Sequence, residues 1–575
     1  GVADANNNQN LRPRKAEERK PGKPETQACI LVNNSFIRTM PKSISYSTAS
    51  MSNLSNLFDE CLELYGGEEN NDASLRCITE KLQVEIEASR WDTNKWFLIY
   101  SAALIFFMQA GFAMLCAGSV RMKNVQNTML KNLLDACGAA LGFFSVGYAF
   151  AFGGQFDRDD TTFIGSTNFF MMNVDNESYW LFQFAFAATA ATIVAGTLAE
   201  RCQMIAYLCY SVLLTGFVYP VVAHSIWSNN GFLSPFNKDP FLGVGMIDFA
   251  GSGVVHTTGG ITALFATLIL GPRKGRFYDN RGNPLRKPTP FPGHSVALQM
   301  LGTFILWFGW YGFNPGSALT ISNIRVQGEV ASHAAVSTTL SAASGCVVAL
   351  FCNLIIKERL KGEAQFDLIK AMNGSLAGLV AVTAGCSVVE PWAAVVIGAI
   401  AGFIYLGASK LLIMYRLDDA VDAIPVHLFN GVWGVLAVGL FASPVKMAMV
   451  YENDDHVGWF YSWSRGSSDA SLLACQVCGV LFICGWVVAI MFPFFIWLNY
   501  LGWFRADSLE ELVGLDISYH GGSVSNAEDV KSEYMEAFRR QKQLRQRRGS
   551  RQPQSGTTTT DEENGNGPVL EEIAN

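Results

Sequence analysis

The sequence predicts an all-α membrane protein with eleven transmembrane helices. Of its 575 residues, 50% are hydrophobic and only 16% are charged, whereas soluble chains carry about 25% charged residues. The apolar residues come in blocks of about 20, the length at which a helix crosses about 30 Å of hydrocarbon. The 53 glycines agree with this class, because glycine is more frequent in membrane helices than in soluble ones.

Each predicted span is one apolar block. They lie at residues 96–119, 128–153, 178–200, 203–227, 249–271, 295–314, 330–356, 368–387, 391–412, 424–442 and 472–500. The seventh and eighth are interrupted by Ser and Thr, which usually face a neighbouring helix or a cavity. Spans one to five and six to ten form the two halves expected of an inverted repeat, in which the fifth and tenth spans correspond.

The basic residues predict the orientation of the chain. Lys and Arg concentrate in the odd-numbered loops, above all in the fifth, which holds Arg273, Lys274, Arg276, Arg281, Arg286 and Lys287. The positive-inside rule places these loops in the cytoplasm. We therefore expect a multi-pass protein of the plasma membrane with its N-terminus outside and its C-terminus inside.

The sequence divides into three parts. Residues 1–90 form a polar, partly disordered extracellular segment, 91–505 the membrane domain, and 506–575 a cytosolic tail with a low-complexity, disordered end. Asn33-Asn-Ser35 and Asn53-Leu-Ser55 are glycosylation sequons. Cys61 and Cys77 also lie in the outer segment. Outside the cell these thiols can oxidise, within a chain or between chains, and free thiols are the alternative.

Two histidines lie inside predicted spans, each shortly after an aspartate that opens the span. They are His256, after Asp248, and His427, after Asp422. Aspartates at this position commonly cap the helix N-terminus, and a single histidine in a span commonly packs. Two such histidines instead favour a functional site, because an ionisable group in a membrane is costly and imidazole relays protons near neutral pH.

Aromatic residues cluster near the predicted outer ends of the third, fourth and sixth spans. The third span carries Phe182 and Phe186 on one helix face, the fourth ends at Trp227, and the sixth ends Trp307-Phe-Gly-Trp310-Tyr-Gly-Phe313-Asn-Pro-Gly-Ser317. Aromatics at this depth are commonly interface anchors. The alternative is an aromatic cage that attracts a cation through the ring faces.

Four long motifs resemble the ammonium transporter family, which includes the methylammonium permeases and the Rhesus glycoproteins. They are Phe112-Ala-Met-Leu-Cys-Ala-Gly118, Gly196-Thr-Leu-Ala-Glu-Arg201, Asp248-Phe-Ala-Gly-Ser-Gly-Val-Val-His256 with the stretch to Arg276, and Gly309-Trp-Tyr-Gly-Phe-Asn-Pro-Gly-Ser317. They occur in the family's order. The resemblance covers about residues 90–520 and is strongest to plant-type ammonium transporters.

The resemblance implies roles for the residues named above. His256 and His427 resemble the twin histidines that line the family's pore, and Phe186 and Phe313 resemble its stacked phenyl gate. Trp227, Phe182 and Ser317 resemble the outer recruitment site for ammonium, with Trp310 lining the pore and Asp248 supporting the cation indirectly. The family's members form homotrimers with one pore in each subunit.

These roles imply a mechanism that physical chemistry supports. Ammonium and potassium are similar in size, but only ammonium can lose a proton. A dry aromatic constriction makes a bare cation costly, whereas neutral ammonia passes at much lower cost. We therefore expect ammonium to be deprotonated near the gate, with the proton relayed through His256 and His427.

The C-terminal tail resembles the family's cytosolic regulatory tail. In plant-type members a Thr in a Gly-x-Asp-x-Thr-x-His-Gly-Gly context is phosphorylated and closes the pore, and here Ser518 takes that place. Phosphate would repel Asp516 and undock the tail, and an ordinary polar serine is the alternative. Farther along, Arg539, Arg540, Lys542, Arg545, Arg547 and Arg548 form a basic stretch, either solvated or in contact with anionic lipid.

Other functions remain open or are excluded. An ammonium sensor that signals through the tail and a Rhesus-type neutral ammonia channel are the alternatives to a transporter. The sequence offers no nucleophile–base pair, phosphate loop or metal-ligand spacing, so we expect no enzyme activity, no cofactor, no metal and no nucleic-acid partner. The expected partners are ammonium or ammonia, membrane lipid and other copies of this chain.

Overall fold

The computed structural model describes residues 61, 71–155, 160–279, 281–322, 325–362 and 364–521. The chain divides into two units, residues 1–48 and 49–575, and every described residue belongs to the second. Both sequons, the basic stretch of the tail and its low-complexity end lie outside the described residues.

The described residues are helical, and the only β contacts among them are isolated bridges. The long helices are α3 (Asn71–Ser119), α4 (Val125–Gly142), α6 (Glu177–Thr197), α7 (Met204–Leu213), α9 (Thr258–Leu270), α10 (Val296–Phe313), α11 (Arg325–Lys361), α12 (Leu368–Thr383), α13 (Pro391–Met414), α14 (Asn430–Phe441) and α17 (Ser471–Tyr500). Shorter helices are α5 (Tyr148–Phe152), α8 (Tyr219–Trp227), α15 (Pro444–Tyr451), α16 (Trp459–Ser464), α18 (Ser508–Val513) and α19 (Leu515–His520).

Within the described residues, 10 helical segments are long and apolar enough to cross a membrane. The all-helical membrane class is therefore confirmed. The predicted eighth span corresponds to α12, which is 16 residues long and falls below that length. Eleven spans, their orientation and the inverted repeat remain predictions.

The first predicted span begins much later than the helix that contains it. α3 starts at Asn71, whereas the apolar block starts near residue 96. The helix therefore continues into the polar segment that we predicted for residues 1–90. Cys61 and Cys77 form a disulfide within the chain, with their Cα atoms 5.9 Å apart.

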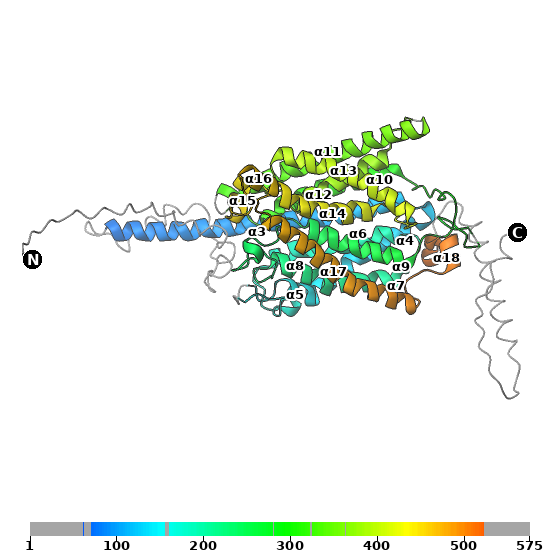
Figure 1. Cartoon of the computed structure of the whole chain (residues 1–575). Helices are drawn as coiled ribbons and strands as arrows, with labels where there is room; N and C mark the ends of the chain where they lie inside the picture. The colour runs from blue at the N-terminus through cyan, green and yellow to red at the C-terminus, as the bar shows by residue number, and fades with distance from the viewer. Residues whose placement is uncertain are drawn as a thin grey trace, which may run out of the picture. The chain divides into compact units, whose positions relative to one another are not determined.

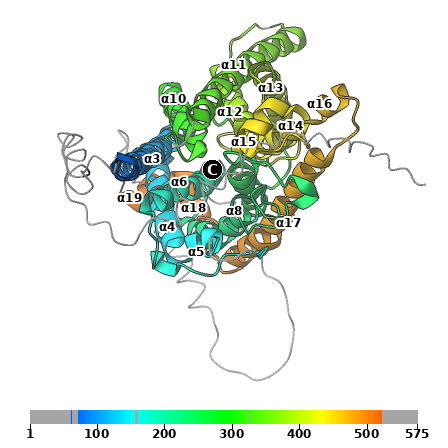
Figure 2. The same ribbon diagram turned by 90° about the vertical axis from the view of Figure 1, so that its left-hand side faces the viewer.

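The helices run side by side as a bundle (Figure 1). The helices α15 and α16 lie at one end of this bundle, which we call the loop end, and α18 lies at the other, which we call the tail end (Figure 1). Figure 2 views the bundle from the loop end. Small residues allow close helix contacts: a Cβ atom added to Gly302 of α10 would lie 2.4 Å from the backbone nitrogen of Leu115 in α3.

The described residues include four π-helical segments: η3 (Phe143–Gly147), η5 (Leu214–Val218), η7 (Ser252–Thr257) and η9 (Ile424–Phe429). Two of them, η7 and η9, begin the helical segments that continue as α9 and α14. They carry His256 and His427 respectively. π-Helical turns occur frequently at functional sites, and these two bring the histidines into one site.

Candidate functional site

Asp248 fixes the start of the segment that carries His256. Its carboxylate accepts hydrogen bonds from the backbone N–H groups of Gly251 (3.0 Å), Gly253 (2.9 Å) and Val254 (2.8 Å). Gly251 has a φ of 103°, in the left-handed region that favours glycine. Asp248 therefore caps the free N–H groups of a helix start, and it lies 3% exposed beneath Trp227, whose Nε1 donates to its carbonyl at 2.7 Å.

The tenth span is capped by a different aspartate from the one that the sequence pattern indicates. Asp419 accepts hydrogen bonds from the N–H groups of Val421 (3.1 Å) and Ile424 (2.7 Å). Asp422 has a φ of 59°, and its side chain accepts a hydrogen bond from Lys370. Asp422 therefore does not cap its helical segment as Asp248 does, because its left-handed backbone conformation directs the carboxylate away from the helix start.

The two histidines lie in direct contact in the interior of the bundle. Nδ1 of His427 lies 3.2 Å from Nδ1 of His256, and their rings stack with centroids 5.2 Å apart. One Nδ1 donates to the other, so the pair holds at most one proton between these two atoms. Nε2 of His256 is buried and has no hydrogen-bond partner among the described residues. The pair is thus a hydrogen-bonded contact between two elements that are 171 residues apart.

An unbroken series of aromatic rings leads from the histidines toward the ends of α6 and α10. The ring of Trp310 stacks on His256 with centroids 5.2 Å apart, and that of Phe313 lies 5.5 Å from the same imidazole. Phe186 then lies 4.2 Å from Phe313. All four side chains are at most 1% exposed. A passage at this point is therefore closed by two phenyl rings.

The predicted outer site lies directly beyond these phenyl rings. Phe182 lies 4.9 Å from Phe186, and Trp227 meets Phe186 edge-on at 5.6 Å. Ser317 lies in the short helix η8 (Pro315–Ala318), where its Oγ donates to the carbonyl of Phe313 at 2.8 Å. Trp227 and Ser317 are half-buried. The structure therefore brings the predicted cage residues to one place, next to the predicted gate.

A narrow cavity of about 20 Å³ continues from His427 on the side away from the phenyl rings. It is lined by Phe112, Leu115, Cys116, Thr192, Ile193, Gly196, Asn373, Leu376, Val421, Ala423, Val426 and His427. Phe112 lies 6.2 Å from the His427 ring. The cavity borders His427, His427 contacts His256, and Phe313 and then Phe186 follow on the other side.

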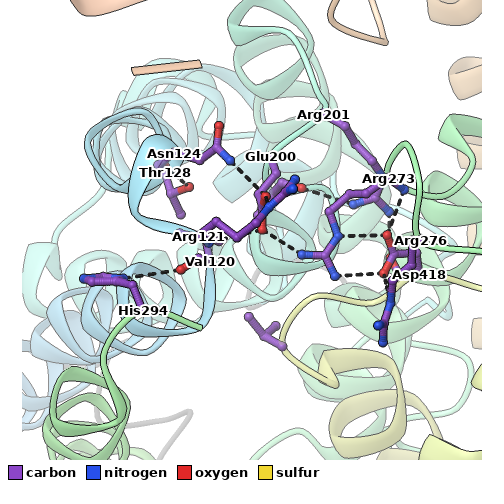
Figure 3. A network of polar contacts seen from close by, with 12 residues as sticks. Val120, Arg121, Asn124, Thr128, Glu200, Arg201, Arg273, Arg276, His294 and Asp418 are labelled. Atoms are coloured by element: carbon purple, nitrogen blue, oxygen red, sulfur yellow. Dashed lines mark hydrogen bonds and ion pairs between the residues drawn. The ribbon is translucent and has the colours of Figure 1, made fainter. Parts of the chain in front are cut away.

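Buried ion pairs join four loops at the tail end of the bundle (Figure 3). Arg273 pairs with Asp418 at 2.8 Å and with Glu200 at 2.7 Å, and Arg121 also pairs with Glu200. Burial opposes these charges, but Arg273 holds the pKa of Asp418 below its usual value. Asp418 and Glu200 likewise hold the pKa of Arg273 above its usual value, despite its burial. The loops therefore remain charged and fixed to one another.

The tail docks on this ionic cluster and on α4. Asp516 accepts hydrogen bonds from the N–H groups of Gln126 (3.0 Å) and Asn127 (2.7 Å) at the start of α4. The side chain of Asn124 connects the tail to the ionic cluster. Its Nδ2 donates to Glu200 at 2.9 Å, and its Oδ1 accepts from the N–H of Leu515 at 2.9 Å. Glu511 of the tail adds further contacts, because its carboxylate accepts from the N–H of Lys274 at 2.7 Å and its carbonyl accepts from Lys123 Nζ at 3.3 Å.

Ser518 lies two residues beyond this contact, in α19. It is half-buried, and its Oγ donates to the carbonyl of Gly514 at 2.9 Å. A phosphate on this atom would add negative charge to the short helix that carries Asp516.

Sequence reasoning missed several residues of this site. Thr383 accepts the indole N–H of Trp310 at 3.0 Å and so orients that ring. Val421 and Asn373 line the cavity below His427. Phe112 lies in a motif that carries the resemblance, so that motif was a usable signal. Thr383 and Val421 carry no such signal, since each is an ordinary residue for its position. No group of three potential metal ligands occurs in the described part of the chain.

The sequence of this chain is similar to those of known ammonium transporters. The sequence profile of the Ammonium Transporter Family matches residues 96–525. The chain is 42% identical to Ammonium transporter 1 member 3 of Solanum lycopersicum, over 80% of this chain and 99% of that protein. It is 40% identical to Ammonium transporter 3 of Dictyostelium discoideum, over 74% of this chain and 92% of that protein.

Solved structures agree with these sequence relatives. A protein titled Sensor Amt Protein is 33% identical, with a TM-score of 0.64 and coverage of 76% of this chain and 100% of that one. Mep2 of Candida albicans is 25% identical, with a TM-score of 0.62 and coverage of 73% and 87% respectively.

Proposed function

This chain belongs to the ammonium transporter family, and from that premise we propose how it moves ammonium. Its relatives are membrane transporters rather than enzymes. We propose that Trp227, Phe182 and Ser317 capture ammonium, that the ion loses a proton near Phe186 and Phe313, and that ammonia continues through the pore. The proton crosses separately along His256 and His427.

Selectivity in this proposal comes from chemistry rather than from size. The ring faces of Phe182 and Trp227 attract a cation, by about 0.5–2 kcal/mol for each contact. Beyond them, the buried rings of Phe186 and Phe313 leave no water to solvate a charge. Potassium must then enter as a bare ion, at a high cost. Ammonium avoids that cost because it can leave its charge behind.

The histidine contact is the observation that carries the proposal. Two imidazoles with their Nδ1 atoms 3.2 Å apart can pass a proton from one ring to the other. The buried Nε2 of His256 supplies a further acceptor or donor within the pore. Asp248 contributes indirectly, because its three hydrogen bonds hold the turn that carries His256. Trp310 contributes by stacking on the same ring.

We further propose a homotrimer in the plasma membrane, with membrane lipid around it, an extracellular N-terminus and a cytosolic tail. In this orientation the loop end is outside and the tail end inside. The basic residues of the fifth loop, which lies at the tail end with Arg273, support this orientation. Residues 1–90 then form the extracellular segment, 91–505 the membrane domain and 506–575 the regulatory tail.

Voltage-clamp recording of cells that express the full chain tests this function. We expect an inward current on addition of ammonium and none on addition of an equal concentration of potassium. Uptake of ammonium without current would instead favour the neutral ammonia channel of Rhesus type. If the protein is present at the surface and neither ammonium uptake nor current is detected, transport is contradicted altogether.

A sensor role is the second candidate, and the docked tail favours it. Asn124 and Glu511 join the tail to the loops of the ionic cluster, so a change in these loops would reach the tail through their hydrogen bonds. The similar structure titled Sensor Amt Protein keeps this candidate open. A sensor would pass an ammonium-dependent signal in a variant that carries no ammonium current.

A further inference from the structure

Val421 is one of the residues that line the cavity below His427. It is half-buried and follows Asp418 of the ionic cluster at the tail end by three residues. Its side chain rests on Gly196, since a Cβ atom added to that glycine would lie 2.5 Å from Val421 Cγ2. The same Cβ atom would lie 3.2 Å from Cys116 Sγ. Gly196, Cys116 and Val421 therefore pack against one another in the wall of the cavity.

The backbone of Val421 is held on both sides. Its N–H donates to Oδ1 of Asp419 at 3.1 Å, and its carbonyl accepts a hydrogen bond from the amide of Asn373 at 3.4 Å. The same Asn373 amide donates to the hydroxyl of Tyr405 at 3.2 Å. Val421 is therefore connected to α12 and α13 as well as to its own loop.

A half-buried clasp fixes the residue that follows, Asp422. Oδ2 of Asp422 accepts hydrogen bonds from Lys370 Nζ (3.0 Å), the Tyr405 hydroxyl (2.9 Å) and Ser409 Oγ (3.0 Å). The Lys370 ammonium also lies 3.0 Å from the Tyr405 hydroxyl and 2.9 Å from Ser409 Oγ. Asp422 has a φ of 59°, a conformation that persists in a residue other than glycine when its surroundings fix it.

We infer that Val421 sets the size limit at the inner end of the pore and that the Lys370–Asp422 clasp holds it there. The inference deepens the proposed function and rests on it. A cavity of about 20 Å³ accommodates one molecule of the size of water. Ammonia has that size, whereas methylamine carries one more carbon. The two methyl groups of Val421 thus occupy the space that the larger molecule needs.

The test is the ratio of methylammonium to ammonium uptake in cells that express the full chain. Val421→Ala removes the two methyl groups, and we expect the ratio to rise several-fold while ammonium uptake persists. Val421→Leu adds bulk and lowers the ratio. Val438→Ala removes the same two methyl groups from a fully buried valine of α14 that does not line the cavity, and it keeps the original ratio.

A second set of variants tests whether Lys370 positions Val421. Lys370→Met breaks the clasp and raises the ratio as Val421→Ala does, whereas Lys370→Arg preserves the charge and restores the original ratio. The exchange Lys370→Asp with Asp422→Lys also restores it. In a chain that already carries Val421→Ala, Lys370→Met adds nothing, because Lys370 acts through the side chain that is gone.

The outcomes separate this inference from the proposed function. An unaltered chain that reaches the surface and carries no ammonium overturns the proposed function. Normal ammonium uptake with an unchanged ratio in Val421→Ala overturns the size limit alone. A raised ratio in Val421→Ala, together with an unchanged ratio in Lys370→Met, overturns only the role of the clasp.

Discussion

The phenyl rings of Phe186 and Phe313 lie with their centroids 4.2 Å apart, in the interior of the bundle. Both side chains are at most 1% exposed. Two rings at this separation leave no room for a hydrated ion between them. We propose that this contact is the barrier that only an uncharged molecule crosses readily.

Phe186→Ala should therefore weaken discrimination against potassium. The loss of one ring admits water, and water lowers the cost of a bare cation at this point. We expect potassium to carry current in the variant and ammonium current to persist. The measurement is voltage clamp with each cation in turn. Phe184→Ala is the matched control, since Phe184 is a buried phenylalanine of the same helix that stacks on Trp180.

The control matters because both substitutions remove a buried ring. Each should destabilise the protein by about 3–5 kcal/mol, so surface expression is measured alongside the current. Potassium exclusion that survives in Phe186→Ala would contradict a barrier role for the phenyl pair.

Ser518→Asp should lower ammonium current several-fold. The added carboxylate lies two residues from Asp516, and repulsion between them weakens the hydrogen bonds that Asp516 accepts from Gln126 and Asn127. Ser518→Ala should keep the current of the original chain. Ser508→Asp places the same charge on an exposed serine of the tail and should have no effect. Equal currents in Ser518→Asp and Ser508→Asp would argue against a switch at Ser518.

Substitutions of Asp248 should lower the melting temperature and the ammonium current by an amount that depends on the new residue. Asn keeps one of the two oxygens that accept backbone N–H groups, whereas Ala keeps neither. Loss of such a cap destabilises a protein by about 0.5–2 kcal/mol. We expect Asp248→Ala to lower both the melting temperature in detergent and the ammonium current more than Asp248→Asn. If Asp248→Ala is as stable and as active as the original chain, Asp248 does not support the turn that carries His256.

The stability of the protein should fall as pH rises toward neutrality, in part because of Asp419. Burial and the charge of Asp422 raise the pKa of Asp419 from 3.8 to about 7. Between these values the folded state holds a proton that the unfolded state has lost, so the free energy of unfolding decreases with increasing pH. Melting curves in detergent at pH 5 and pH 8 measure this. Asp419→Asn cannot ionise, so its melting temperature should fall less over this interval; an equal fall would contradict the shift.

Much of the site follows from the sequence, because long motifs carry it. The sequence predicts the histidines, the phenyl pair and the outer aromatic residues, and the structure brings them together. Their distances could not be predicted, since His256 and His427 are 171 residues apart and meet only through the packing of η7 against η9.

The errors have local physical causes. The pattern of an aspartate before an apolar block points to Asp422 as the cap, but the cap is Asp419 because Asp422 adopts a left-handed conformation. Hydropathy places the first span at residue 96 because it detects apolar length, and it cannot detect the polar helical turns that begin at Asn71. Val421 is invisible to such reasoning, since its place in the cavity depends on residues from other helices.

The most direct test of the proton relay removes both imidazoles. Ammonium current is measured by voltage clamp in the double variant His256→Ala with His427→Ala, at surface levels matched to the original chain. We expect the selective ammonium current to be lost, because the proton then has no route past the phenyl rings. An undiminished and still selective ammonium current in this variant would contradict the relay.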